Sequence, residues 1–239
     1  MRQVFLSDVE MYYSTKITND IIEIAGDEYH HLKDVMRHKI DDEIYVTDGK
    51  GVIYHCKIKL IEKNKLECKI FSSIKIENKL KGITFCIPRM KSADRFEFAL
   101  EKTVELGITN FIVFDSKRTI AKGEKLDRWQ KIVMAAMKQS LRAWLPSIRY
   151  VKHIESLFSF DGGIILFDQN ANDNFTNFIS SNNQSLITNN WFFIFGPEGG
   201  FEKEELKIKN EVYQIKLTEN RLRSETAIIT AASILAVQV

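Results

Sequence analysis

Two short motifs near the C-terminus carry residue types suited to binding a ligand through the main chain. The first spans Phe195–Phe201 (FGPEGGF), and the second follows at Leu222–Ala227 (LRSETA). Gly196, Gly199 and Gly200 have no β-carbon, so a ligand can approach their N–H and C=O groups closely. The first motif lacks the spacing of the dinucleotide fingerprint and of the phosphate-binding P-loop. The pattern therefore favours either a ligand other than a simple phosphate or a tight turn that binds nothing.

The runs that flank these motifs predict the elements that position them. Trp191–Phe195 consists of aromatic residues and one isoleucine, as in a fully buried strand, and the polar run Glu202–Leu206 predicts the start of a helix. Tyr213–Leu217 alternates like another strand, and the polar loop Thr218–Arg221 follows it. Each motif then comes just after a strand, where open α/β sheets bind their ligands.

A long apolar run follows the second motif and predicts a buried helix. Ala227–Val237 is apolar on nearly every side, which favours burial between domains or subunits. Arg223 and Glu225 stand at the start of this helix, next to a loop that is suited to bind a ligand. The alternative is that Ser224 caps the helix and that Arg223 and Glu225 form a solvated ion pair.

Together these residues resemble the RsmE family, the SPOUT methyltransferases that methylate N3 of a uridine in small-subunit (16S) ribosomal RNA. The resemblance spans the whole chain and combines the two motifs with further segments, which are Met1–Phe5, His30–Arg37, Asp48–Gly51, Glu101–Gly107 and Gln139–Arg142 with Pro146. One residue departs from the family pattern, because Thr218 stands where the family has a glycine. The departure affects the expected shape of that loop and not the resemblance.

The resemblance implies a fold, a cofactor and an oligomeric state. The implied fold is α/β, with a SPOUT-type domain of mostly parallel sheet and a C-terminal trefoil knot, preceded by a small PUA-like β-barrel. Knots of this kind are rare exceptions among protein folds. The implied cofactor is S-adenosylmethionine, and the residues implied to bind it are Leu166, Phe195, Gly196, Glu198, Gly199, Gly200, Leu217, Leu222, Arg223, Ser224 and Thr226. The family pattern also implies a homodimer through the SPOUT domain.

Methyl transfer to a uracil nitrogen requires alignment of the reactants and loss of a proton, and it needs no metal. The N3–H group stays protonated at neutral pH and lies on the pairing edge, so the base must be unpaired or flipped into the pocket. The hypothesis is that Arg223 steadies the developing uracil anion or the cofactor carboxylate, and that Glu225 orients it or serves as the base. Glu105 and Arg142 are second candidates, which can also serve helix packing alone.

Two other functions fit parts of the pattern. Related SPOUT families methylate a ribose 2′-hydroxyl with a similar knot, and a non-catalytic RNA-binding module can keep the fold without the chemistry. The intact residues Gly199, Gly200 and Arg223–Glu225 disfavour the non-catalytic module. The segment His30–Leu32 favours the uracil family over the ribose enzymes.

Two domains are predicted, a barrel over residues 1–75 and the SPOUT domain over residues 80–239. In the first, Ile44–Thr47 and Val52–Ile58 flank the turn Asp48–Gly51 as a hairpin, and Leu66–Ile70 alternates as a further strand. In the second, strands at Ile83–Ile87, Phe111–Phe114 and Ile164–Phe167 alternate with helices, which favours a parallel sheet. Those helices are predicted at Ser92–Leu106, at the apolar stripe from Trp129 to Trp144, and within 170–190.

The predicted barrel contains one helix, Glu28–Lys39, which is rich in histidine and basic residues. A zinc site there is disfavoured because no cysteine or second ligand pair is near, so a polar surface helix is the preferred interpretation. The resemblance implies that this barrel binds RNA and makes Arg2 and Arg37 candidate contacts. The alternative is that both are ordinary surface arginines.

The net charge of +2 conceals a basic middle third. Residues 73–155 hold 17 Lys and Arg against 9 Asp and Glu, whereas both flanking thirds are slightly acidic. A local excess of this kind attracts phosphate backbones, so Arg89, Lys91 and Arg142 are candidate RNA contacts. An ordinary set of solvated helix faces is an equally good interpretation.

The remaining composition predicts a cytoplasmic protein that binds neither membrane nor metal. The three cysteines, Cys56, Cys68 and Cys86, lie in strand-like runs without C-x-x-C spacing, which is typical of reduced core residues. No secretory signal and no run of about 20 apolar residues is present in the sequence. The partner that the resemblance implies is ribosomal RNA or the small ribosomal subunit.

Overall fold

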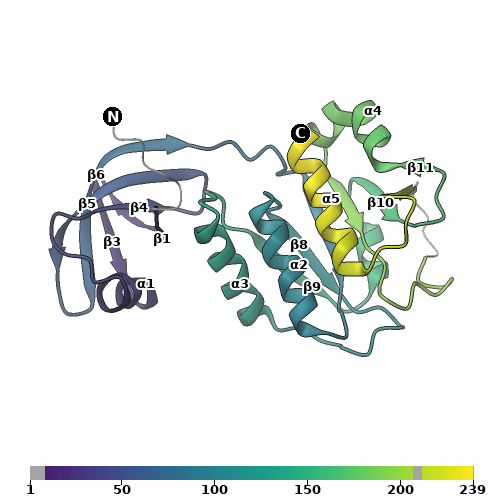
Figure 1. Ribbon diagram of the computed structural model, residues 1–239, viewed down its shortest axis with the longest axis horizontal. Helices are drawn as coiled ribbons and strands as arrows, with labels where there is room; N and C mark the ends of the chain where they lie inside the picture. Colours follow the sequence, from purple (N-terminus) through teal and green to yellow (C-terminus); the bar gives the residue numbers. More distant parts are fainter. Residues whose placement is uncertain (1–8, 207–211, 239) are drawn as a thin grey trace. The chain divides into compact units, whose positions relative to one another are not determined.

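A computed structural model describes residues 9–206 and 212–238 (Figure 1). The chain divides into two compact units, of which the first contains the residues up to Asn78 together with Met137–Leu145. The second contains Lys79–Ala136 and the chain from Pro146 on. Sequence patterns assign 137–145 to the second domain, whereas main-chain hydrogen bonds from Gly51 N–H to Ala143 O (3.0 Å) and from Leu145 N–H to Gly49 O (2.9 Å) tie it to the first.

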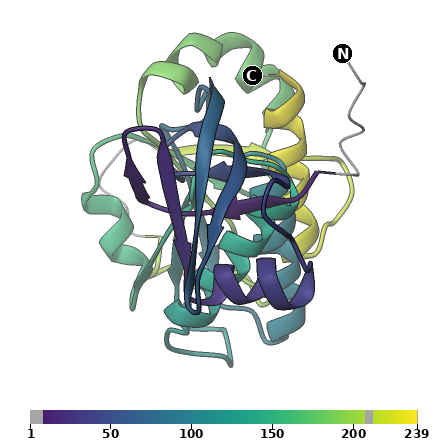
Figure 2. The same cartoon turned by 90° about the vertical axis from the view of Figure 1, so that its left-hand side faces the viewer.

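The first unit is a six-stranded mixed sheet that closes on itself. Its strands follow one another in the sheet as β1-β4-β5-β6-β3-β2, and their bounds are β1 Met11–Tyr13, β2 Lys16–Thr18, β3 Ile21–Ala25, β4 Glu43–Thr47, β5 Val52–Ile61 and β6 Lys65–Lys75. Strands β1 and β2 are the two edge strands of this sheet, yet only two residues join them in sequence. The sheet must therefore curl so that its two edges come close. Ser14 links the two sides, because its N–H donates to Thr47 O (3.1 Å) and its hydroxyl to Glu23 O (2.5 Å). The predicted barrel is confirmed, and Figure 2 shows its purple and blue strands crossing steeply.

The helix of the first unit is shorter than predicted. It consists of α1, Asp27–His30, and a π-helical turn η2, His31–Val35, both anchored by the buried side chains of Tyr29 and Leu32. The prediction of a helix to residue 39 is wrong because Arg37 adopts φ 59°, in the left-handed region, which ends the helical path. Among the described residues, no three His, Cys, Asp or Glu side chains gather as a metal site would require.

The second unit is a seven-stranded sheet in which every pairing is parallel, as the sequence predicts. The order is β11-β13-β10-β12-β7-β8-β9, with bounds β7 Ile83–Pro88, β8 Asn110–Phe114, β9 Ser147–Val151, β10 Gly163–Phe167, β11 Asp173–Asn174, β12 Trp191–Ile194 and β13 Val212–Lys216. Because all strands run the same way, their carboxyl ends share one edge. Two strands of this sheet, β9 and the two-residue β11, were not predicted. The trefoil knot implied by the resemblance stays a prediction.

Helices of the second unit are α2 Ala93–Glu105, most of α3 Leu126–Gln139, α4 Phe175–Thr188 and α5 Ser224–Gln238, with a 3-10 turn η3 at Ile154–Ser159. The predicted bounds of α2 are confirmed, because the Ser92 hydroxyl accepts a hydrogen bond from the Arg95 N–H (3.4 Å) and Gly107 follows at φ 100°. The stripe predicted to reach Trp144 is wrong beyond residue 139, because Leu141 has φ 55° and interrupts the helix.

Helix α5 packs beside α2 (Figure 1) and is buried on one face only. Ile228, Ala231 and Leu235 on that face are fully buried, whereas Val237 is 86% exposed. The prediction of burial on nearly every side is therefore not met by this chain alone. No helix in the described part of the chain has the length and apolar character needed to cross a membrane.

All three cysteines lie in the two cores, as predicted. Cys56 and Cys68 are fully buried in the barrel, and Cys86 is fully buried in β7 of the parallel sheet. None of them forms a disulfide. Burial raises the pKa of the Cys86 thiol, so this side chain stays protonated within the sheet.

Candidate active site

The carboxyl ends of β10, β12 and β13 bring together the predicted residues Leu166, Phe195 and Leu217. Leu166 pairs in register with Ile194 on one side and with Gln214 on the other. Leu166 and Phe195 are buried, and the half-buried Leu217 follows β13 directly. Leu166 packs in the core that contains Ile194, whereas the Phe195 ring stacks on Phe167 with centroids 4.8 Å apart. The three strands thus end together at the edge where parallel sheets bind ligands.

The glycine-rich loop leaves β12 at this edge and has free space beside it. A β-carbon at Gly196 would meet only the Phe201 ring, at 3.6 Å, and its φ lies outside the left-handed region. Neither crowding nor strain within the chain therefore explains glycine at this position. Gly200 has φ 70°, which L residues rarely adopt, and nothing lies within 4 Å of the position of a β-carbon there. The loop thus leaves room for a ligand beside Gly196.

The chain after this loop does not begin a helix at Glu202, which corrects the prediction. Residues 203–206 form turns, and residues 207–211 lie outside the described chain. The buried Glu205 carboxylate explains the turns, because it accepts hydrogen bonds from the N–H groups of Glu202 (2.9 Å) and Lys117 (2.9 Å). Burial alone would raise the pKa of Glu205, but these hydrogen bonds outweigh it and hold the pKa below its ordinary value.

A single hydrogen bond joins the two motifs. The Ser224 hydroxyl donates to the Gly196 carbonyl at 2.7 Å, and Ser224 is itself buried as the first residue of α5. Its hydroxyl therefore serves the glycine-rich loop, which differs from the alternative of a simple helix cap. Around it, Leu222 is half-buried, and Arg223 and Thr226 are exposed. The residue that departs from the family pattern, Thr218, donates from its own hydroxyl to Asn220 O (2.9 Å) and closes the loop locally.

Charged side chains surround the glycine-rich loop. Glu225 pairs with Arg95 (Nε to Oε1, 3.7 Å), which differs from the alternative of a solvated pair with Arg223. The same guanidinium lies 3.8 Å from the exposed Glu198 carboxylate. Arg118 donates from Nη1 to the Gly199 carbonyl at 3.0 Å. The second oxygen of Glu225, Oε2, is buried and has no hydrogen-bond partner among the described residues.

The predicted RNA contacts differ in their exposure. Arg37 and Arg142 are exposed on the first unit, and Lys91 is exposed on the second. Arg2 lies outside the described residues. Arg89 is only 4% exposed, at odds with its prediction as a surface contact.

Two aromatic rings account for the burial of Arg89. Its guanidinium lies over Trp129 at 5.0 Å and over Phe96 at 5.3 Å, measured to the ring centroids. Burial lowers the pKa of this guanidinium, and the charge of Asp115 acts in the opposite direction. Arg89 is therefore part of the packing between α2 and α3.

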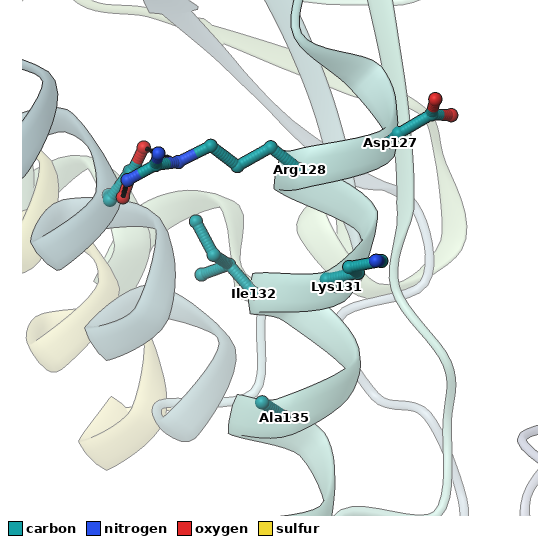
Figure 3. A pocket seen from close by; sticks show the side chains of 6 residues that line it. Asp127, Arg128, Lys131, Ile132 and Ala135 are labelled. Atoms are coloured by element: carbon teal, nitrogen blue, oxygen red, sulfur yellow. Dashed lines mark hydrogen bonds and ion pairs between the residues drawn. The ribbon is translucent and has the colours of Figure 1, made fainter. Parts of the chain in front are cut away.

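A hollow of about 550 Å³ lies between α2 and α3, and no motif residue lines it (Figure 3). Its lining residues are Glu97, Asp127, Arg128, Lys131, Ile132 and Ala135. Arg128 reaches across to the Glu97 carboxylate (Nε to Oε1, 2.6 Å), and Lys131 and Asp127 point away from that pair. The charges of Arg128 and Glu97 thus offset each other within the protein.

Sequence reasoning counted Arg95 and Arg118 only among the basic residues of the middle third, and it did not place them or Glu205 beside the two motifs. Arg95 and Arg118 lie in the segments that follow the carboxyl ends of β7 and β8, at the same edge as the motifs. That position after a predicted strand is the signal that identifies them. Nothing in the sequence pairs Glu205 with Lys117, which is 88 residues away.

Comparisons with known proteins agree with this fold. The family model for an RNA methyltransferase domain matches residues 77–236, and the model for an RNA methyltransferase PUA domain matches residues 24–71. Ribosomal RNA small subunit methyltransferase E of Aquifex aeolicus is 28% identical over 95% of this chain and 99% of its own length. The protein of the same name from Mesomycoplasma hyopneumoniae is 30% identical, over 83% of this chain and 86% of its own.

A solved structure extends the likeness to the whole fold. Ribosomal RNA small subunit methyltransferase E from Neisseria gonorrhoeae, bound to S-adenosyl methionine, matches with a TM-score of 0.81 at 24% identity. The match covers 96% of this chain and 97% of that one. With the family models and the Mesomycoplasma relative, this places the chain in the RNA methyltransferase family of ribosomal RNA small subunit methyltransferase E, the RsmE family.

Proposed function

We propose that this protein transfers the methyl group of S-adenosylmethionine to N3 of a uridine in small-subunit ribosomal RNA. The observation that carries the proposal is the meeting of the two motifs at one sheet edge, joined by the Ser224–Gly196 hydrogen bond. The names of the Aquifex and Mesomycoplasma relatives support the ribosomal RNA substrate. The bound S-adenosyl methionine of the Neisseria protein supports the cofactor.

The residues at this edge fit such a cofactor. S-adenosylmethionine supplies an electrophilic methyl group when bound. Glycine at 196 leaves unfilled the position of a β-carbon, which would meet only the Phe201 ring at 3.6 Å. The half-buried Leu217 and Leu222 offer apolar surface to an adenine ring, with the buried Leu166 and Phe195 as the core behind them. The exposed residues 198–200, Arg223 and Thr226 offer polar groups to its ribose and amino-acid portions.

Glu225 is the proposed proton acceptor, and Arg223 the proposed stabiliser of charge. The buried Oε2 of Glu225 has no donor within the described chain, and the uracil N3–H is a donor that matches it. As N3 loses its proton, negative charge spreads to O2 and O4 of the ring. The exposed Arg223 guanidinium, two residues before Glu225, offsets that charge.

The RNA contact and the dimer are further parts of the proposal. Arg37 and Arg142 on the first unit, Lys91 on the second, and Arg2 at the N-terminus are the proposed phosphate contacts. The exposed C-terminal end of α5, with Val237 at 86% exposure, and the residues of this helix that are only partly buried support a homodimer through the second unit. The free thiols of Cys56, Cys68 and Cys86 support a cytoplasmic location.

Two experiments test the proposed reaction. Methylation of N3 blocks pairing, so reverse transcription of ribosomal RNA should stop at one uridine in the wild type and read through in a deletion strain. A ribose 2′-methyl mark, the rival product, would leave the pairing edge intact. Purified protein with tritiated S-adenosylmethionine should label small-subunit RNA, and Glu225→Gln and Arg223→Ala should each lower the rate by about 100-fold or more. Unchanged rates in both folded variants would remove these residues from the mechanism.

A further inference from the structure

Arg95 belongs to neither motif, yet its side chain lies close to both of them. It lies in the first turn of α2, which packs beside α5 (Figure 1). Its guanidinium lies 3.7 Å from Glu225 Oε1, at the start of α5, and 3.8 Å from Glu198 Oε1, in the glycine-rich loop. One side chain thus faces the acidic residues of both motifs.

The two contacts differ in their surroundings. The Glu198 side chain is 40% exposed, so its ion pair with the 45% exposed Arg95 is weakened by solvent. The Glu225 side chain is only 13% exposed. A carboxylate in such a place needs an opposite charge, and Arg95 supplies it to one oxygen only. The other oxygen, Oε2, stays buried and without a hydrogen bond among the described residues.

We propose that Arg95 is a positioning residue, which fixes the Glu225 carboxylate so that Oε2 is left to accept a hydrogen bond from the target base. This inference rests on the proposed function. Arg95 need not touch the base, because its effect passes through Glu225. A freely rotating Glu225 would place its oxygen correctly for only part of the time, and small misplacements of a reacting group lower rates by up to about 100-fold.

The test is a double-mutant cycle on Arg95 and Glu225. Arg95→Met keeps the side-chain stem and removes the charge, and at 45% exposure it does not threaten folding. Single-turnover methylation of saturating small-subunit RNA is measured for wild type, Arg95→Met, Glu225→Gln and the double variant, with melting temperatures as a check. Arg128→Ala is the matched control, because Arg128 is an exposed arginine paired with a glutamate on α2 outside the site (Figure 3).

Arg95→Met should lower the rate by about 10- to 100-fold. In the Glu225→Gln background the same change should have no further effect, because the group it positions is gone. Arg95→Lys should restore part of the rate, and Arg128→Ala should leave it unchanged. The dissociation constant for S-adenosylmethionine in Arg95→Met should stay within about five-fold of wild type, as expected for an exposed pair with Glu198.

Two results would overturn the inference while leaving the proposed function in place. In the first, the wild type is active and Arg95→Met methylates RNA at the same rate. In the second, the rate losses of Arg95→Met and Glu225→Gln multiply in the double variant, so the two residues act independently. A wild type that binds cofactor and does not methylate small-subunit RNA would instead refute the proposed function, and this inference with it.

Discussion

Alanine at Gly196 is expected to separate cofactor binding from folding. A β-carbon at this position would meet the Phe201 ring at 3.6 Å, an ordinary contact, and φ is not in the left-handed region. Replacing glycine by alanine at a compatible position restricts the unfolded chain and stabilises a protein by about 0.4–1 kcal/mol. The cofactor-free variant should therefore be as stable as the wild type or slightly more stable.

The same methyl group would occupy the space proposed for the cofactor. Placing one extra methyl group in a packed contact costs about 1–3 kcal/mol. Since about 1.4 kcal/mol is a factor of 10, the dissociation constant for S-adenosylmethionine should rise by about 5- to 150-fold. Calorimetric titration of the purified variant measures this constant, and urea unfolding without cofactor measures its stability.

Alanine at Gly200 is the matched control. Gly200 has φ 70° with nothing near its absent β-carbon, so alanine there costs about 1–2 kcal/mol of backbone strain without filling any contact within the chain. Gly200→Ala should thus lose stability in the absence of cofactor, which Gly196→Ala should not. If Gly196→Ala bound S-adenosylmethionine as tightly as the wild type, the cofactor would not lie beside Gly196.

Three further predictions concern stability. Ser224→Ala removes the donor to the buried end of the glycine-rich loop and should cost about 1–2 kcal/mol, measured by urea unfolding. Glu205 has a pKa held below its ordinary 4.5 in the folded state, so the stability it contributes is present above pH 4.5 and lost as the pH falls through its folded pKa. The free energy of unfolding of Glu205→Gln should therefore be about 1–3 kcal/mol lower than that of the wild type at pH 7, and the difference should be smaller at pH 3. Arg89→Met should change stability by less than about 1.5 kcal/mol, since the stem and its packing remain, whereas Arg89→Ala should cost about 2–5 kcal/mol and lower the melting temperature.

Local patterns predicted six strands and one helix to within a residue or two, whereas β5 and β6 extend past their predicted ends. Alternation across Val52–Ile58 and the turn Asp48–Gly51 reflects neighbours in sequence, and so does the capping of α2 by Ser92. The end of α3 could not be predicted, because Leu141 is not a residue type that usually adopts φ 55°. Tertiary hydrogen bonds to the first unit draw this segment away from the helical path that its apolar stripe favours.

Site residues that lie within one short motif could be predicted from the sequence, whereas contacts between residues far apart in the sequence could not. The glycine spacing of 196–200 and the sequence Arg223–Glu225 can be recognised in the sequence itself. The partner of Glu225 could not be predicted, because Arg95 reaches it only through the packing of α2 beside α5. Arg89 was misplaced for the same reason, since the two rings that enclose it come from separate helices.

The three buried cysteines can report local unfolding of the protein. A thiol reagent attacks the thiolate, and all three cysteines are inaccessible at 0% exposure, so modification must wait for the surrounding structure to open. Cys56 and Cys68 sample the barrel, whereas Cys86 samples the parallel sheet. Mass spectrometry of pulse-alkylated protein can therefore time the loosening of each unit separately, without any engineered label.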